Sequence, residues 1–167
     1  MRLRGDMVEA DVVSVMAEWS VRRAQAGDAG PWAALRQALW PDEGPSRHLH
    51  DAADILGRPE RAVAFLAFDD RGAAIGFAEA TLRSDYVNGT ESSPVGFLEG
   101  WYVTPARRGA GIGRALVAAV ERWTQQHGCA ELGSDALLDN VGSHRAHAAC
   151  GFEETERVVY FRKRLQD

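Results

Sequence analysis

A glycine-rich stretch flanked by arginines is the part of this sequence whose residue types point most directly to chemistry. It reads Arg-Arg-Gly-Ala-Gly-Ile-Gly-Arg over residues 107–114, between an expected strand and a long amphipathic helix. Glycines let a ligand approach the backbone closely, and the first N–H groups of a helix attract phosphate oxygens. We therefore expect residues 107–114 to bind a pyrophosphate. The alternative is that the three glycines only make a tight connection.

Two familiar phosphate-binding motifs do not fit this stretch. A Rossmann fingerprint follows the first strand of its βαβ unit, whereas residues 107–114 lie two-thirds of the way along the chain. A Walker loop ends in Gly-Lys-Ser/Thr, and that ending is missing here. The glycine-rich stretch therefore predicts a phosphate site of another class.

Two carboxylates are further candidates for a functional site. Glu99 interrupts the apolar run over residues 95–103, and a buried charge without a partner or a function would be costly. The alternative is that Glu99 faces solvent from its strand or pairs with an arginine. Asp135 ends the next expected strand, where its alternative role is the N-cap of the following segment.

The apolar patterns predict the elements that would position these residues. Their order is β-α-α-β-β-β-α-β-α-β, which indicates a mixed α/β class with the later helices as crossovers. Residues 1–18 are expected to be an N-terminal extension, and residues 19–167 to form a single domain. The expected strands cover residues 19–24, 62–68, 73–82, 95–103, 131–135 and 156–164, and the expected helices cover residues 31–39, 48–56, 113–127 and 140–149.

Composition narrows the class of protein further. The 167 residues are 46% hydrophobic and carry a formal charge of −5, which argues against a binder of duplex nucleic acid. No apolar run is long enough to span a membrane and no signal peptide is apparent, so we expect a soluble, cytoplasmic protein. Two cysteines are too few for a disulfide scaffold, and no His or Cys spacing demands a metal. We expect the histidines other than His147 at the surface, namely His48, His50, His127 and His144.

Two segments resemble signatures of the GCN5-related N-acetyltransferases. Residues 103–113, Val-Thr-Pro-Ala-Arg-Arg-Gly-Ala-Gly-Ile-Gly, are similar to the acetyl-CoA signature, and residues 148–152, Ala-Ala-Cys-Gly-Phe, to the later Gly-Phe segment. From residue 21 to residue 164 the chain resembles the aminoglycoside 6′-N-acetyltransferases in particular. The runs that narrow the match are residues 35–41, 85–89, 92–95, 97–100 and 151–157.

The resemblance implies a fold, a reaction and an assembly. The implied fold has a mixed, mostly antiparallel sheet whose strands splay at the acetyl-CoA site, with helices on its faces. The implied reaction is acetyl transfer from acetyl-CoA to the 6′-amine of an aminoglycoside antibiotic by direct attack in a ternary complex, without a metal, which would confer resistance. The implied assembly is a homodimer, in which the apolar strand over residues 156–164 could be shared between subunits.

The resemblance also assigns roles to individual residues. An alkyl ammonium needs a carboxylate that attracts the cation and accepts its proton, and Glu99 and Asp135 are the candidates. His147 occupies a position where many family members have a tyrosine, so it either protonates the leaving thiolate or only lines the cofactor channel while water delivers the proton. The cofactor-binding residues implied are Trp101, Tyr102, Val103, Arg108, Gly109, Ala110, Gly111, Ile112, Gly113, Arg114, Asn140 and His147, and the substrate-binding residues implied are Trp40, Asp85, Tyr86, Glu99, Asp135 and Glu156.

Several of these assignments keep an alternative. Trp40 and Tyr86 could offer flat surfaces to sugar rings or could anchor loops or the core, and Glu156 taken alone would be a solvated surface charge. The acceptor could be another amine, such as a polyamine, a small metabolite or a protein terminus. A non-catalytic acyl-CoA sensor would keep the glycine-rich stretch without the amine chemistry.

Overall fold

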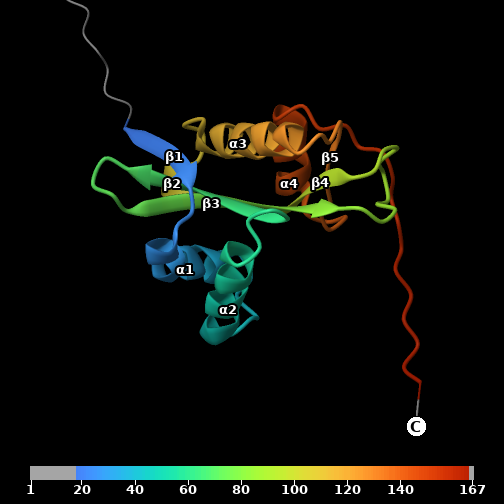
Figure 1. The fold of residues 1–167 in the computed structure, drawn as a ribbon, viewed down its shortest axis with the longest axis horizontal. Coiled ribbons are helices and arrows are strands. Elements are labelled where there is room, and N and C mark those ends of the chain that lie inside the picture. The colour runs from blue at the N-terminus through green and yellow to red at the C-terminus, as the bar shows by residue number, and fades with distance from the viewer. Residues whose placement is uncertain (1–17, 166–167) are drawn as a thin grey trace, which may run out of the picture.

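A five-stranded sheet forms the middle layer of the computed structural model, which describes residues 18–165 (Figure 1). The strands lie in chain order and neighbours are antiparallel, except that the last pair is parallel. The predicted mixed, mostly antiparallel sheet is therefore confirmed. The strands are β1 (Trp19–Arg23), β2 (Ala62–Asp69), β3 (Ala74–Arg83), β4 (Val95–Val103) and β5 (Leu132–Ser134).

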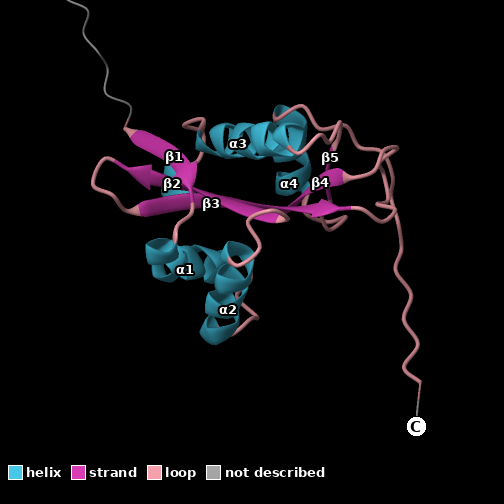
Figure 2. Ribbon diagram, viewed as in Figure 1, coloured by secondary structure: helices cyan, strands magenta, loops and turns pink. Residues whose placement is uncertain are grey.

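Helices cover both faces of this sheet, as Figure 2 shows. On one face lie α1 (Ala29–Leu39) and α2 (Pro45–Leu56), and on the other α3 (Ile112–Gln126) and α4 (Val141–Ala149). Short 3-10 turns, η1 (Ala26–Asp28) and η2 (Pro105–Arg107), precede α1 and follow β4. Among residues 18–165, no helix has both the length and the apolar character needed to cross a bilayer.

Each face of the sheet buries its own apolar core. Beneath α3, Leu116 and Val120 pack with Leu98 of β4 and its neighbours in β2 and β3. Beneath α1 and α2, Trp32 packs with Phe77 and its surroundings. Burial of side chains of this size stabilises the fold by about 1.5–3 kcal/mol each, so both helical layers are firmly held to the sheet.

The strands β4 and β5 separate soon after they meet. Their pairing covers only three positions, which are Gly96 with Leu132, Phe97 with Gly133, and Leu98 with Ser134. The strand β4 continues to Val103, paired on its other side with β3. The edge of β4 that faces β5 is therefore free of strand pairing after Leu98, which is the predicted splayed strand pair.

A β-bulge lies where this separation begins. Gly100 pairs with Glu79 of β3 and Leu98 pairs with Ala80, so Glu99 has no partner in β3. A bulge inserts one extra residue and redirects the side chains around it, and bulges are frequent beside active sites. Glu99 accordingly projects from the sheet and is exposed, while the residues on either side of it are buried.

The structure differs from the predicted order of elements at the C-terminal end. Residues 156–164 form no strand; they extend away from the sheet in Figure 1, and the side chains from Val158 to Phe161 are 48–93% exposed. A strand needs an edge to pair with, and within residues 18–165 this segment pairs with no strand. The predicted extension over residues 1–18 lies outside the described residues except for Glu18.

Candidate active site

The glycine-rich stretch forms a turn that opens directly into α3. Gly109 and Gly111 have φ angles of 80° and 83°, in the left-handed region that glycine adopts without strain. Gly111 is the N-cap of α3 and offers no side chain, and no other side chain of residues 18–165 is hydrogen-bonded to the amides that follow it. The first backbone N–H groups of α3 therefore have no side-chain cap within the described residues, which is the condition that the predicted anion site requires.

Close packing explains the third glycine. A Cβ at Gly113 would lie 3.0 Å from Cζ2 of Trp101, so the indole of β4 lies against the first turn of α3. Ile112 turns its side chain into the core and is 1% exposed, whereas Ala110 is exposed. Ile112 can therefore contribute only backbone groups to a ligand at this turn.

The three arginines of the turn tie it to neighbouring elements. Nε of Arg108 donates to the carbonyl of Val103 at 3.0 Å, and Nη2 of Arg114 donates to the carbonyl of Ala149 at 2.7 Å. Arg107 lies 3.3 Å from the carboxylate of Asp69. These contacts fix the turn between β4, α4 and the β2–β3 hairpin, and they place positive charge close to the start of α3.

The next predicted cofactor residues follow the bulge in β4. Trp101, Tyr102 and Val103 are half-buried and pair with β3 through Ala78, Phe77 and Gly76. Their other backbone edge faces the point where β5 has ended. The geometry therefore offers backbone groups of β4 to an extended ligand that runs from the glycine turn along this strand.

His147 of α4 lies where β4 and β5 separate. Its Nδ1 is 2.8 Å from the carbonyl of Ser143, which requires that this nitrogen carries the proton and donates. In the neutral ring Nε2 is then an acceptor, and it lies 2.8 Å from Oγ of Ser134. The ring also meets the edge of Trp101 at 5.6 Å between centroids. His147 is thus held by partners on α4, β5 and β4.

Asn140 and Asp135 lie in the connection between β5 and α4. Oδ1 of Asn140 accepts a hydrogen bond from the N–H of Ser143 at 3.0 Å, which makes Asn140 the N-cap of α4. Asp135 directly follows β5 and is exposed. The alternative role of Asp135 as the cap of the next helix is therefore wrong, and no residue from 18 to 165 makes a hydrogen bond or ion pair with its carboxylate.

Glu99 is not an isolated carboxylate in the structure. Nη2 of Arg83 donates to both carboxylate oxygens of Glu99 at 2.8 Å, and Nε donates to Oε1 at 3.2 Å. The hydroxyl of Thr81 donates to the same carboxylate. The bulge of β4 therefore presents Glu99 as the alternative interpretation described it, an exposed strand carboxylate paired with an arginine.

Trp40 packs against the residue next to Glu99. A Cβ at Gly100 would lie 2.3 Å from Cη2 of Trp40, so only glycine allows this contact. The guanidinium of Arg36 lies 4.7 Å from the centre of the indole, and Nε2 of His48 lies 3.2 Å from the carbonyl of Trp40. His48 is fully buried, so the expectation that it lies at the surface is wrong.

Three predicted substrate residues lie apart from this group. Asp85 and Tyr86 are in the loop between β3 and β4, where Tyr86 is 79% exposed, and Glu156 is in the extended C-terminal segment. In the part of the chain that the structure describes, no hydrogen bond or ion pair joins them to Glu99 or Asp135. A single chain therefore brings Trp40 and Glu99 close to the cofactor residues, whereas the three outer substrate residues lie apart from them.

Sequence reasoning missed a buried ionic network behind Trp40. Glu79 is 2% exposed, accepts a hydrogen bond from Nε1 of Trp32 at 2.7 Å and pairs with Arg36, which also pairs with Asp51 at 2.8 Å. Burial raises the pKa of Glu79, although Arg36 and Trp32 oppose this shift. A sequence signal for Glu79 was available. Like Glu99, it is a carboxylate that interrupts an apolar run, in this case the run of β3.

Arg83, Thr81 and Ser134 were missed as well. Each contacts a predicted catalytic residue, Glu99 or His147. No local pattern distinguishes these three residues from other polar residues near strand ends. Their role depends on the register between strands, which spacing along the chain does not give.

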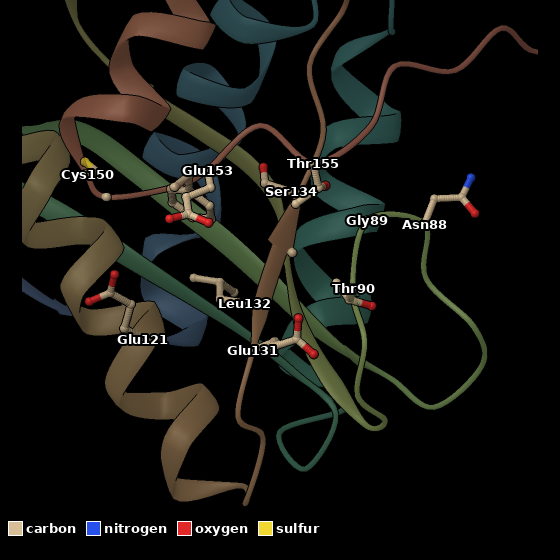
Figure 3. Close-up of a pocket in the computed structure, with 13 residues that line it drawn as sticks. Asn88, Gly89, Thr90, Glu121, Glu131, Leu132, Ser134, Cys150, Glu153 and Thr155 are labelled. Carbon is tan, nitrogen blue, oxygen red and sulfur yellow. The ribbon is translucent and has the colours of Figure 1, made fainter.

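A pocket of about 340 Å³ lies beside the free edge of β5, and Figure 3 shows the residues that line it. Glu121, Glu131 and Glu153 give it an acidic character, and none of the predicted site residues lines it. Hydrogen bonds from the side chain of Ser92 and from the amides of Glu91 and Ser92 hold the pKa of Glu131 below its usual value. No group of three or more metal-ligating side chains occurs among residues 18–165.

The model of the acetyltransferase (GNAT) family matches residues 32–152, which include most of α1, the strands β2 to β5 and the glycine turn. The chain belongs to the GNAT acetyltransferase family. Its members use acetyl-CoA as the acetyl donor, and the helix start with free amides beside the open edge of β4 is the part of this GNAT chain that fits such a ligand.

Relatives of this GNAT protein carry a more specific name. The chain is 56% identical over 147 residues to an aminoglycoside N(6′)-acetyltransferase type 1 of Stenotrophomonas maltophilia, covering 88% of this chain and 94% of the relative. It is 49% identical over 133 residues to the enzyme of that name in Salmonella typhimurium, covering 80% and 90%.

Solved structures agree with these sequence relatives. AAC(6′)-Iy, in complex with the bisubstrate analogue CoA-S-monomethyl-acetylneamine, superimposes with a TM-score of 0.83 at 45% identity, covering 88% of this chain and 99% of that one. The aminoglycoside antibiotic 6′-N-acetyltransferase AAC(6′)-Ih from Acinetobacter baumannii gives 0.84 at 43% identity, covering 89% and 99%. The predicted resemblance to this group of GNAT enzymes is confirmed.

Proposed function

We propose that this protein transfers an acetyl group from acetyl-CoA to the 6′-amine of aminoglycoside antibiotics and so confers resistance. The observation that carries the proposal is the start of α3, with free amides, beside the unpaired edge of β4 and the Glu99 bulge. The similarity to enzymes of this name, over 80–88% of this chain, supports the same acceptor. We place the reaction in the cytoplasm, as the sequence predicts.

The cofactor half of the proposed site is built mainly from backbone. Amides from Gly109 to Arg114 hold the diphosphate, because they are uncapped and lie at the positive end of the α3 dipole. Backbone groups of Trp101, Tyr102 and Val103 bind the extended arm of the cofactor beyond the end of β5. Acetyl-CoA supplies the activated acyl carbon, and donors on β4 stabilise charge at its oxygen. The Nδ2 group of Asn140 is free to contact the cofactor while Oδ1 caps α4.

The acceptor half is acidic and flanked by an aromatic residue. Glu99 and Asp135 attract the protonated amine, and Glu99 accepts its proton, directly or through water, before the amine attacks. Trp40, next to the bulge, offers a flat face to a sugar ring. Asp85, Tyr86 and Glu156 contact the outer ammonium groups and rings. Positioning and electrostatics, without a covalent intermediate, supply the rate enhancement.

The proton for the leaving thiolate comes from the pair formed by His147 and Ser134. Nδ1–H of His147 is committed to the carbonyl of Ser143, so the ring donates through Nε2 only when it is protonated. The hydroxyl of Ser134, 2.8 Å from Nε2, is the other donor at this place. In this step the protonated ring gives its Nε2 proton to Oγ of Ser134 while the Ser134 hydroxyl gives its own proton to the thiolate, which leaves His147 neutral and the CoA thiol protonated.

We also propose that the protein is a homodimer that exchanges its C-terminal segments. Apolar side chains from Val158 to Phe161 are exposed in the single chain, and such a run usually marks an interaction surface. The free edge of β5 can accept a further strand, and the acidic pocket beside it matches the basic residues Arg162, Lys163 and Arg164 of that segment. Glu156 begins the segment, so its contribution to the acceptor site depends on the dimer.

Steady-state kinetics with a panel of acceptors tests the proposed function. We expect release of the CoA thiol with aminoglycosides that carry a 6′-amine, and much lower kcat/KM with spermidine and with peptides. Comparable low turnover on all acceptors would remove the antibiotic as the substrate. Binding of acetyl-CoA without thiol release on any amine would instead support a sensor.

A further inference from the structure

Arg83 holds the carboxylate that the proposed function assigns to the acceptor amine. It is the last residue of β3, and its guanidinium makes three hydrogen bonds to Glu99 at 2.8–3.2 Å. The guanidinium also lies over the buried ring of Phe97, with its Cζ 3.5 Å from the centre of the ring. Arg83 is thus held between an aromatic face and the carboxylate, in the geometry that suits a planar guanidinium.

This contact neutralises the charge of Glu99. An ammonium group that approaches the bulge of β4 meets an ion pair of zero net charge, and both oxygens of the carboxylate are already in use. Oε1 accepts from Thr81 as well as from Arg83. The attraction of Glu99 for a cation is therefore weak until Arg83 releases at least one carboxylate oxygen.

The surroundings of Arg83 allow that release. The side chains of Arg83 and Glu99 are 39% and 31% exposed, and the loop of residues 84–94 starts immediately after Arg83. Ion pairs that are this accessible to water shift an equilibrium by only about two- to fivefold. The buried pair of Arg36 and Glu79 on the same face of the sheet, with side chains 6% and 3% exposed, has no such freedom.

We propose that Arg83 is an internal counter-ion of Glu99 that the ammonium group of the acceptor displaces, so that Arg83 sets the affinity for the acceptor. The inference rests on the proposed function and goes beyond it, because it names a competitor for the same carboxylate. A site whose competent state is only a fraction of the population binds more weakly by that fraction. Arg83 therefore weakens the binding of every cation that uses Glu99.

A double-mutant cycle measured by calorimetry tests this competition. Kanamycin is titrated into the full-length protein and its variants Arg83→Gln, Glu99→Gln and the double variant, at about 0.15 M salt, where charges more than about 8 Å apart are largely screened. We expect Arg83→Gln to tighten kanamycin binding about two- to fivefold more when Glu99 is present than in the Glu99→Gln background. Arg58→Gln, which breaks the exposed pair with Asp54 on α2, is the matched control and should change binding less than twofold.

Two results would overturn the inference. Weaker kanamycin binding by Arg83→Gln with Glu99 intact would mean that Arg83 supports the acceptor site, and equal tightening in both backgrounds would mean only long-range repulsion. If Arg83→Gln folds poorly, Arg83→Lys replaces it as the test variant. Lysine keeps the charge without the bidentate contact, so we expect Arg83→Lys to bind kanamycin more tightly than the wild type, by less than the change expected for Arg83→Gln. Failure of the wild-type protein to bind or acetylate kanamycin and every other aminoglycoside with a 6′-amine would instead refute the proposed function itself.

A second measurement needs no variant of the site. The 15N-labelled Nε of Arg83 should shift or broaden in NMR spectra when kanamycin binds, because its hydrogen bond to Glu99 is released. The Nε signal of Arg58 should stay unchanged. An unchanged Arg83 signal in a protein saturated with kanamycin would contradict displacement.

Discussion

At the scale of single residues, the β-bulge of β4 gives Glu99 its special position. A regular strand would place residue 99 opposite a residue of β3, whereas the bulge leaves it unpaired and directs its carboxylate outward, next to the face where Trp40 packs on Gly100. His147 has a comparable position on the other side of the opening, held by Ser143 and Ser134. The proposed base and the proposed acid therefore come from β4 and α4.

The variant Glu99→Gln tests the role of the base. We expect kcat for an aminoglycoside to fall by roughly tenfold to ten-thousandfold, because the amine loses the group that accepts its proton. Glu60→Gln, at an exposed carboxylate between α2 and β2, is the control and should keep wild-type kinetics. An unchanged kcat and an unchanged pH profile for Glu99→Gln would assign the base to another residue.

At the scale of elements, α1 and β4 are locked together where Trp40 meets Gly100. The indole lies between this glycine, the ring of Phe77 and the guanidinium of Arg36, and Arg36 is itself bound to Glu79 and Asp51. Breaking a buried ion pair by removal of one partner is strongly destabilising. The ionic network therefore fixes the helix that carries Trp40 onto the strand that carries Glu99.

The variant Gly100→Ala tests this contact. The new Cβ would overlap the indole, so we expect a loss of about 1–3 kcal/mol in the free energy of unfolding and a higher KM for the aminoglycoside. Gly27→Ala in η1 is the control: its new Cβ meets open space, so its free energy of unfolding should stay within about 0.5 kcal/mol of the wild-type value. Chemical denaturation measures both changes. Wild-type stability and KM in Gly100→Ala would show that Trp40 is not held at this place.

The same elements show how far the sequence predicts the structure. The apolar runs of β2, β3 and β4 and the periodicity of α3 were readable because burial on a sheet or helix face repeats locally. The bulge at Glu99 was not, because it arises from the register between β3 and β4. Pairing of Glu99 with an arginine was foreseen only as an alternative, and the identity of that arginine, Arg83, depends on the same register. The glycine turn that opens α3 was readable, since its signal is contained in consecutive residues, whereas its binding of a phosphate stays a prediction.

At the scale of the whole molecule, the C-terminal segment is the part that one chain leaves unpaired. The pattern of residues 156–164 predicted a strand, but in the described part of the chain no sheet edge pairs with this segment and its apolar side chains are exposed. Strand exchange with a second copy would satisfy both the pattern and the burial. The prediction that residues 156–164 form a strand therefore does not hold for the single chain and applies only to the proposed dimer.

Light scattering on the full-length protein tests the assembly. We expect the mass of a dimer, about twice 18.2 kDa, and a monomer after the double substitution Tyr160→Asp and Phe161→Asp, which places charges on the apolar segment. Leu49→Asp is the control: it places a charge at an exposed apolar residue of α2, outside the C-terminal segment, and should leave the dimer intact. A monomeric wild-type protein, or a dimer that survives the double substitution, would contradict strand exchange through these residues.

The most direct test of the central claim compares two aminoglycosides that differ only in a 6′-amine or a 6′-hydroxyl group. Release of the CoA thiol and the mass of the product are measured with each compound and acetyl-CoA. We predict stoichiometric thiol release and a single added acetyl group with the 6′-amine, and turnover at least a hundredfold lower with the 6′-hydroxyl. Equal rates on both compounds, or no thiol release on either, would contradict the proposed reaction.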